Sequence, residues 1–116
     1  MILNSVNKVS EQQIDEIINF ATNWWVQRIS KKDIATKEQV AKFENLLKRR
    51  ISTDLAIKLF CELETDISPI NILAEVGLLS KVNSDAFPQK THMDITPTEI
   101  GLVERFGKRQ VIFSIQ

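Results

Sequence analysis

The sequence has 116 residues, of which 43% are hydrophobic and 26% are charged. This composition is typical of an ordinary globular chain and predicts one domain over residues 1–116. Fifteen lysines and arginines balance fifteen aspartates and glutamates, so net charge gives no support for a dedicated nucleic-acid binder. One cysteine and one histidine exclude an internal disulfide and a structural zinc site with four Cys or His ligands. We therefore expect no metal and no cofactor.

The N-terminal segment has none of the features of a targeting sequence. It lacks a charged stretch followed by a long apolar one, as a secretory signal would have. No window of the chain approaches the roughly 20 apolar residues that a membrane span needs. These features predict a cytoplasmic protein that does not contact a membrane.

Two helices are predicted in the first half of the chain, and each starts with a capping box. Ser10 and Gln13 have the spacing in which two side chains satisfy each other's free backbone N–H groups. Apolar residues then recur every three or four positions as far as about Ile29. Thr36 and Gln39 repeat the capping-box spacing after a polar loop.

The middle of the chain predicts a break in the second helix and two further helices. Residues 52–54 are all good cap residues, so we expect the second helix to end near Ile51. A third helix would then carry Leu55, Leu59, Phe60 and Leu63. A serine followed by a proline predicts a fourth helix over residues 69–76, ended by Gly77 in a left-handed conformation.

The last 26 or so residues have the pattern of short strands. Residues of one predicted face alternate with polar residues, and that face comprises Thr91, Met93, Ile95, Ile100, Leu102, Val111, Phe113 and Ile115. Gly107-Lys108 is the predicted turn between the last two strands. The predicted fold is α+β, with three to four N-terminal helices (about residues 10–78) packed on a small C-terminal antiparallel β-meander (about 90–115).

Charge is unevenly distributed along the chain. Residues 28–50 hold eight basic and three acidic side chains, a net charge of +5, whereas residues 51–80 have a net charge of −4. The basic partner-binding candidates are Lys42, Lys48, Arg49 and Arg50, and the acidic ones are Glu62 and Asp66. Two simpler explanations stand beside these roles. Cations near a helix C-terminus stabilise its free carbonyls, and acidic side chains commonly form a solvated helix face.

Trp24 and Trp25 are adjacent on the first predicted helix. Neighbouring helical residues differ by about 100°, so both indoles cannot occupy the centre of one buried stripe. One of the two indoles is therefore expected at the margin of the stripe, and the choice between them stays open. Trp24 is the candidate for an outward-facing contact, because large aromatic side chains are enriched at binding hot spots. The alternative is that both indoles pack in the core.

The sequence contains no constellation of catalytic residues, so we expect that the protein is not an enzyme. Cys61 lies in an apolar stretch of the predicted third helix, without a neighbour that would lower its pKa. His92 falls on the polar side of its predicted strand. Glycine-rich phosphate loops, nucleophile elbows and metal-binding histidine pairs are absent from the sequence. A small enzyme using Cys61 or His92 is the weakest of the functional hypotheses.

Three segments resemble small proteins carried by Firmicutes and their phages. They are N-W-W at 23–25, I-L-A-E at 72–75 and F-P-Q-K-T-H-M at 87–93, the last matching the group's F-P-x-K-T-x-M element. The chain departs from the group at 107–109, where a longer turn with glycine and tyrosine is usual. The resemblance implies a phage or mobile-element context, in which small proteins often antagonise host defence.

We therefore expect a non-enzymatic protein-binding module that occupies a surface of a larger protein, such as a nucleic-acid-processing enzyme inhibited in the manner of an anti-CRISPR protein. The alternative is an accessory nucleic-acid-binding protein that uses the basic segment 28–50. A homodimer is also open, because a terminal meander leaves an edge strand with which a second copy could pair.

Overall fold

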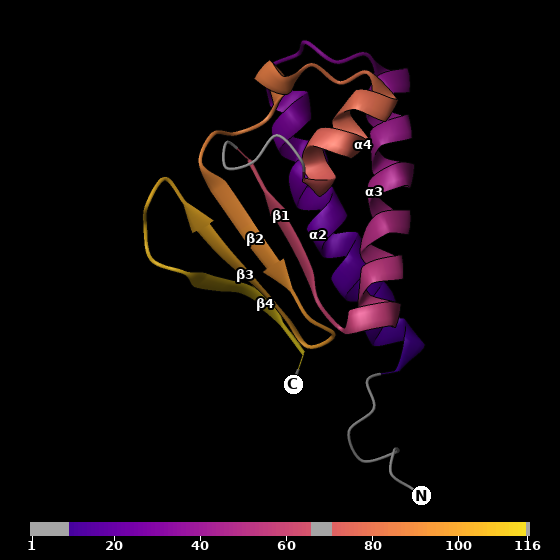
Figure 1. Ribbon diagram of the computed structural model, residues 1–116, viewed down its shortest axis with the longest axis vertical. Helices are drawn as coiled ribbons and strands as arrows, with labels where there is room; N and C mark the ends of the chain where they lie inside the picture. Colours follow the sequence, from indigo (N-terminus) through magenta and orange to yellow (C-terminus); the bar gives the residue numbers. More distant parts are fainter. Residues whose placement is uncertain (1–9, 66–70, 116) are drawn as a thin grey trace, which may run out of the picture.

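The computed structural model describes residues 10–65 and 71–115, which form an α+β domain with a four-stranded antiparallel sheet. Its elements in chain order are α2 (Glu11–Lys31), α3 (Lys37–Lys58), β1 (Cys61–Glu64), α4 (Ile72–Ser80), the 3-10 helix η1 (Ser84–Ala86), β2 (Thr91–Ile95), β3 (Glu99–Glu104) and β4 (Gln110–Ser114). The strands lie in the order β1-β2-β3-β4 (Figure 1). Among the described residues, no helix is long and apolar enough to cross a lipid bilayer.

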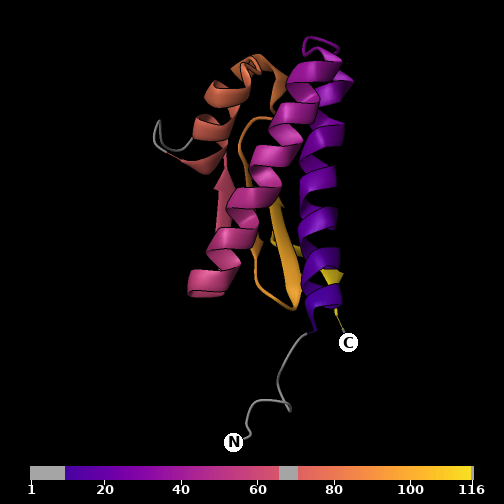
Figure 2. The same ribbon diagram turned by 90° about the vertical axis from the view of Figure 1, so that its right-hand side faces the viewer.

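The helices form one layer and the sheet forms the other (Figures 1 and 2). The core between them includes Trp25, Phe43, Leu63 and Met93, all fully buried. The Trp25 Nε1–H donates a hydrogen bond to the Met93 Sδ over 3.3 Å, which joins α2 to the middle of the sheet. On β2, buried and half-buried residues alternate as the sequence pattern predicts. No helix of the described residues covers the other face of the sheet (Figures 1 and 2).

Both predicted capping boxes are present. The side chains of Ser10 and Gln13 exchange hydrogen bonds with each other's backbone N–H groups at the start of α2. Thr36 and Gln39 do the same at the start of α3. Four free backbone donors are thus satisfied locally, which explains why these two starts could be predicted without tertiary information.

The predicted break near Ile51 and the predicted third helix are wrong. Helix α3 continues to Lys58 and ends at Leu59, which has a left-handed conformation. The Thr53 hydroxyl donates to the Arg49 carbonyl oxygen one turn earlier, and Asp54 is paired with Arg50, so neither side chain caps a new helix. Residues 61–64 form strand β1, which pairs with β2.

The predicted end of the fourth helix is also wrong. Helix α4 starts with Asn71 as its N-cap and continues through Gly77 to Ser80. Lys81 takes the left-handed conformation that had been expected of Gly77. Phe87 packs against Gly77, and a Cβ there would approach its ring to 3.3 Å, so the glycine allows close packing. The predicted start at Ser68 and Pro69 lies outside the described residues.

The turn between β3 and β4 lies two residues before the predicted one. Arg105 and Phe106 both have positive φ angles, of 48° and 67°. The Gly107 N–H donates to the Glu104 carbonyl oxygen over 2.9 Å, which closes a two-residue turn of type I′ character. Gly107 itself does not have a positive φ. The expected Gly107-Lys108 turn is therefore wrong.

Candidate functional site

Both tryptophans lie in the core. Trp25 is fully buried and Trp24 is only 8% exposed. Their rings pack edge to face with centroids 4.9 Å apart, and the Arg28 guanidinium covers the Trp24 ring at 4.0 Å. The expectation of an outward-facing indole at Trp24 is therefore wrong, because Arg28 and the neighbouring indole cover the margin of the stripe.

The basic run on α3 does not form one surface. Arg50 points toward α4, where its guanidinium pairs with Glu75 at 2.7 Å and with Asp54 at 3.4 Å. Lys48 and Arg49 instead line an open groove between α2 and α3, and Lys48 pairs with Glu44 at 3.3 Å. Lys42 is exposed earlier on the helix. Because α3 continues to Lys58, the helix-end explanation for this run is wrong.

The acidic candidate Glu62 lies on a strand and not on a helix. Glu62 is exposed on the outer face of β1 and pairs with the His92 ring at 2.8 Å. Asp66 lies outside the described residues. The sheet adds a second group of charges that sequence spacing could not bring together, because the Arg109 guanidinium joins Asp94 of β2 to Glu99 of β3. The outer face is thus acidic but largely paired within the molecule.

The Arg109 side chain also explains a glycine in the middle of β3. It lies across Gly101, and a Cβ at that position would collide with its guanidinium. The hydrogen bond from Arg109 lowers the pKa of the Asp94 carboxyl, against the opposing effect of its partial burial. The pair therefore holds β2, β3 and the start of β4 together on the solvent side of the sheet.

Cys61 lies on the buried face of β1, next to Asp54 of α3. Burial, together with the nearby Asp54 carboxylate, raises the pKa of the Cys61 thiol to about 12. A thiol with this pKa is protonated at neutral pH and is a poor nucleophile. Cys61 and His92 lie at positions of opposite side-chain direction on neighbouring strands, so they do not form a couple.

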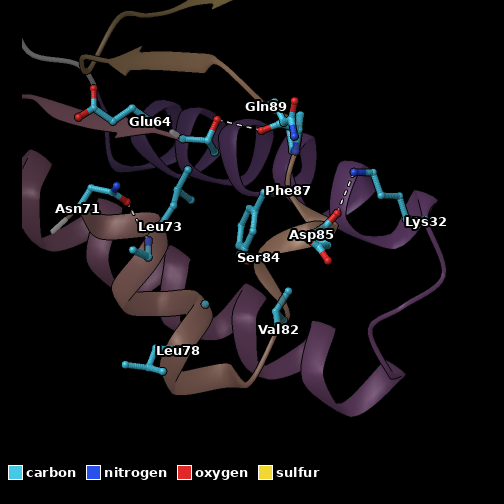
Figure 3. A pocket seen from close by; sticks show the side chains of 14 residues that line it. Lys32, Glu64, Asn71, Leu73, Leu78, Val82, Ser84, Asp85, Phe87 and Gln89 are labelled. Carbon is cyan, nitrogen blue, oxygen red and sulfur yellow. Dashed lines mark hydrogen bonds between the residues drawn. The ribbon is translucent and has the colours of Figure 1, made fainter. Parts of the chain in front are cut away.

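A groove of about 610 Å³ separates α4 from η1 and the start of β2 (Figure 3). Leu73, Val82 and Phe87 contribute its apolar lining. The polar side chains of this groove form contacts within the molecule. Lys32 Nζ donates a hydrogen bond to the Asp85 carbonyl oxygen over 2.8 Å, and the Asn71 side chain caps α4. These contacts hold η1 and the start of α4 in place. Among residues 10–65 and 71–115, no group of His, Cys, Asp and Glu is arranged to hold a metal ion.

The two edges of the sheet differ in length, charge and cover. Strand β1 has four residues, two of them glutamates, and α4 packs against it. Strand β4 has five residues, and no charged side chain occurs anywhere from 110 to 116. Within the described chain no strand pairs with its outer side. An open, neutral edge presents unpaired backbone donors and acceptors to another strand, so β4 is the candidate interaction site.

Side chains beside this edge are apolar on both faces of the sheet. Val111 is 50% exposed on the outer face. On the helical face, the rings of Phe113 and Phe20 are 4.8 Å apart, and Phe20 is also exposed. The sequence pattern placed Val111 and Phe113 on one strand and left an edge strand open to a second copy, but it did not identify β4 as that edge. The expected alternation of Val111 with Phe113 is wrong, because the pairing with β3 shifts register between Ile100 and Gly101 and places the two side chains on opposite faces. The signal that could have identified it is the uncharged C-terminal stretch.

Comparison with known proteins finds no family model and no curated protein that matches this chain.

Proposed function

We propose that this chain is a non-enzymatic protein-binding module that docks on a larger protein by adding its strand β4 to that protein's sheet. The observation that carries the proposal is the open, uncharged edge of β4, which contrasts with the protected edge of β1 on the opposite side of the sheet. Natural proteins usually shield a long edge with charges, bulges or a covering element. Strand β4 has one irregularity in its pairing with β3, opposite Ile100 and Gly101, but it has no charged side chain. A neutral edge without an inward-pointing charge is suited to accept a partner strand.

Strand addition assigns separate roles to the backbone and the side chains of β4. Main-chain hydrogen bonds along the edge supply affinity, and alternating side chains supply selectivity. Val111 would contact the partner on the outer face, whereas Phe113 and Phe20 would contact it on the helical face. This two-sided apolar border favours a partner strand with apolar residues at its own edge.

We further propose that this chain is a phage or mobile-element protein that inhibits a nucleic-acid-processing enzyme. The resemblance of residues 23–25, 72–75 and 87–93 to proteins of Firmicutes and their phages supports this context. The outer face carries more carboxylates than cations, although Glu62, Asp94 and Glu99 are paired with His92 and Arg109, and this excess suits the basic surfaces that such enzymes use for nucleic acid.

The test is capture of a partner from a Firmicute lysate by the tagged chain, after nuclease treatment and with edge variants in parallel. Val111→Lys with Ser114→Lys places two charges on the β4 edge, as natural edge strands do. Leu78→Lys is the control, because Leu78 is 80% exposed on α4, far from this edge in the fold.

We expect a stoichiometric protein that the wild-type chain and Leu78→Lys retain equally. The double variant should recover at least about tenfold less, a difference of about 1.4 kcal/mol in binding free energy. Equal recovery by all three chains would contradict docking through β4. A solution mass of two chains that the edge variant returns to one would assign the edge to a second copy instead.

A further inference from the structure

A second groove lies between the C-terminal end of α2 and the turn that joins β3 to β4. Its volume is about 750 Å³. The lining residues are Gln27, Arg28, Lys31, Lys32, Ala86, Pro88, Gln89, Glu104 and Arg105. Four of these side chains are cationic and one is a carboxylate, in a chain whose charges balance overall. The fold thus concentrates positive charge where two distant parts of the sequence meet.

The cations of this groove lack the carboxylate partners that neutralise other basic residues. Within the described residues, none of Arg28, Lys31, Lys32 and Arg105 forms an ion pair. Arg28 instead lies over the Trp24 ring, and Lys32 bonds a backbone carbonyl. Lys48, Arg50 and Arg109, by contrast, each have a carboxylate within 3.3 Å. The groove therefore presents uncompensated positive charge to solvent.

An exposed aromatic residue directly follows the groove residue Arg105 in the chain. Phe106 follows Arg105 at the tip of the β3–β4 hairpin and is 83% exposed. Lys90 Nζ lies 4.7 Å from the centroid of this ring. An exposed phenyl ring lowers solubility, but it offers a flat surface on which another ring can stack.

The backbone at this tip supports a binding role. Arg105 and Phe106 occupy the two positive-φ positions of the turn, where Asn-Gly is the favoured pair. A phenylalanine or an arginine in the left-handed region costs free energy that asparagine or glycine would not. This turn is therefore less stable than the same turn with Asn-Gly would be, while it presents these two side chains. Strained residues of this kind often occur at binding sites.

We propose that this groove binds single-stranded nucleic acid. Arg28, Lys31, Lys32 and Arg105 contact consecutive phosphates, and Phe106 stacks on an unpaired base. Cationic grooves combined with aromatic platforms are the general chemistry of single-strand binding without sequence preference. A duplex hides its base faces and would leave Phe106 unused, so a single strand fits these residues better. The site is separate from the β4 edge and does not depend on the strand-addition proposal.

The test is fluorescence anisotropy of a labelled twelve-residue oligothymidylate, titrated with the purified chain at several salt concentrations. Lys31→Glu with Arg105→Glu reverses two groove charges. Lys42→Glu with Arg49→Glu makes the same change in net charge on α3, where both side chains are exposed. We expect the groove variant to bind at least about tenfold more weakly and to lose about 1.4 from the salt slope. The α3 variant should change affinity by less than about threefold.

A second variant separates binding from folding. Arg105→Asn with Phe106→Gly installs the favoured type I′ pair, so the melting temperature should rise. Affinity for the oligonucleotide should nevertheless fall by more than about tenfold, because a phosphate contact and the stacking ring are both removed. If this variant bound as tightly as the wild type, Phe106 would have no part in recognition and the proposal would fail.

Three other outcomes would overturn the proposal. The first is no binding at low salt by protein concentrations on the order of 100 µM, which is the weak limit of the usual range of non-specific Kd values even at physiological salt. The second is tighter binding of the matching duplex, which would contradict base stacking. The third is equal competition by polyglutamate, which would assign the groove to an acidic protein segment.

Discussion

The two edges of the sheet, formed by β1 and by β4, have different roles. On the β1 side, Leu63 and Cys61 are buried under the helices, and the carboxylate of Asp54 is paired with Arg50. On the β4 side, Val111 is half exposed and Phe106 is almost fully exposed. Cations are compensated on the first side and uncompensated in the groove beside the β3–β4 turn. This contrast indicates that the β1 side stabilises the fold and the β4 side is available for binding.

The largest effect that would test this contrast is expected from truncating one apolar side chain on each edge strand, buried Leu63 on β1 and exposed Val111 on β4. Leu63→Ala should lower the free energy of unfolding by about 3 kcal/mol, because Leu63 is fully buried and a cavity would remain. Val111→Ala should cost less than about 0.5 kcal/mol, as expected for an exposed side chain. Urea unfolding measures both values. Similar losses from the two strands would contradict the division of roles.

A smaller effect is expected from the ion pair that faces α4. Asp54 is 6% exposed and lies 3.4 Å from Arg50 and 4.0 Å from Lys58. Arg50→Met would leave this carboxylate poorly compensated and should cost about 2 kcal/mol. Lys48→Met is the matched control on the same helix, because its exposed partner makes the pair worth less than about 0.5 kcal/mol. Thermal unfolding of both variants would show whether Arg50 serves stability, as we infer.

The smallest effect concerns acid stability. Hydrogen bonding to Arg109 lowers the pKa of Asp94 in the folded state relative to the unfolded state. The pair therefore stabilises the fold above about pH 4, the ordinary pKa of aspartate, and this contribution is lost as the pH falls through the lowered pKa. Arg109→Met should flatten the dependence of unfolding free energy on pH in this acidic range. A variant that kept the wild-type pH dependence would exclude Asp94 as its source.

The parts of the fold that could be predicted from sequence are those fixed by local contacts. Both capping boxes bond residues three positions apart, so the starts of α2 and α3 follow from spacing alone. The alternation on β2 likewise survives in the sheet. The end of α3 could not be predicted, because the cap-type residue Asp54 is stabilised inside the helix by Arg50 and Lys58.

Features that depend on contacts between segments far apart in the sequence could not be predicted from it. Strand β1 has only four residues, and its register against β2 joins Cys61 to Ile95 across the intervening α4. The cationic groove joins the end of α2 to Arg105, more than 70 positions further along the chain. The sequence predicted an excess of positive charge over residues 28–50. It could not show that Lys31 faces this groove and that Arg50 is neutralised by Glu75.

The most direct test of the account is amide hydrogen exchange on the chain alone and in complex with its captured protein partner. We predict that bound partner slows exchange in residues 110–114 of β4, while exchange in residues 61–64 of β1 stays the same. Such a pattern would assign binding to the edge that carries no charge. Protection confined to β1 or to the outer surface of α3, with β4 unchanged, would contradict the central claim.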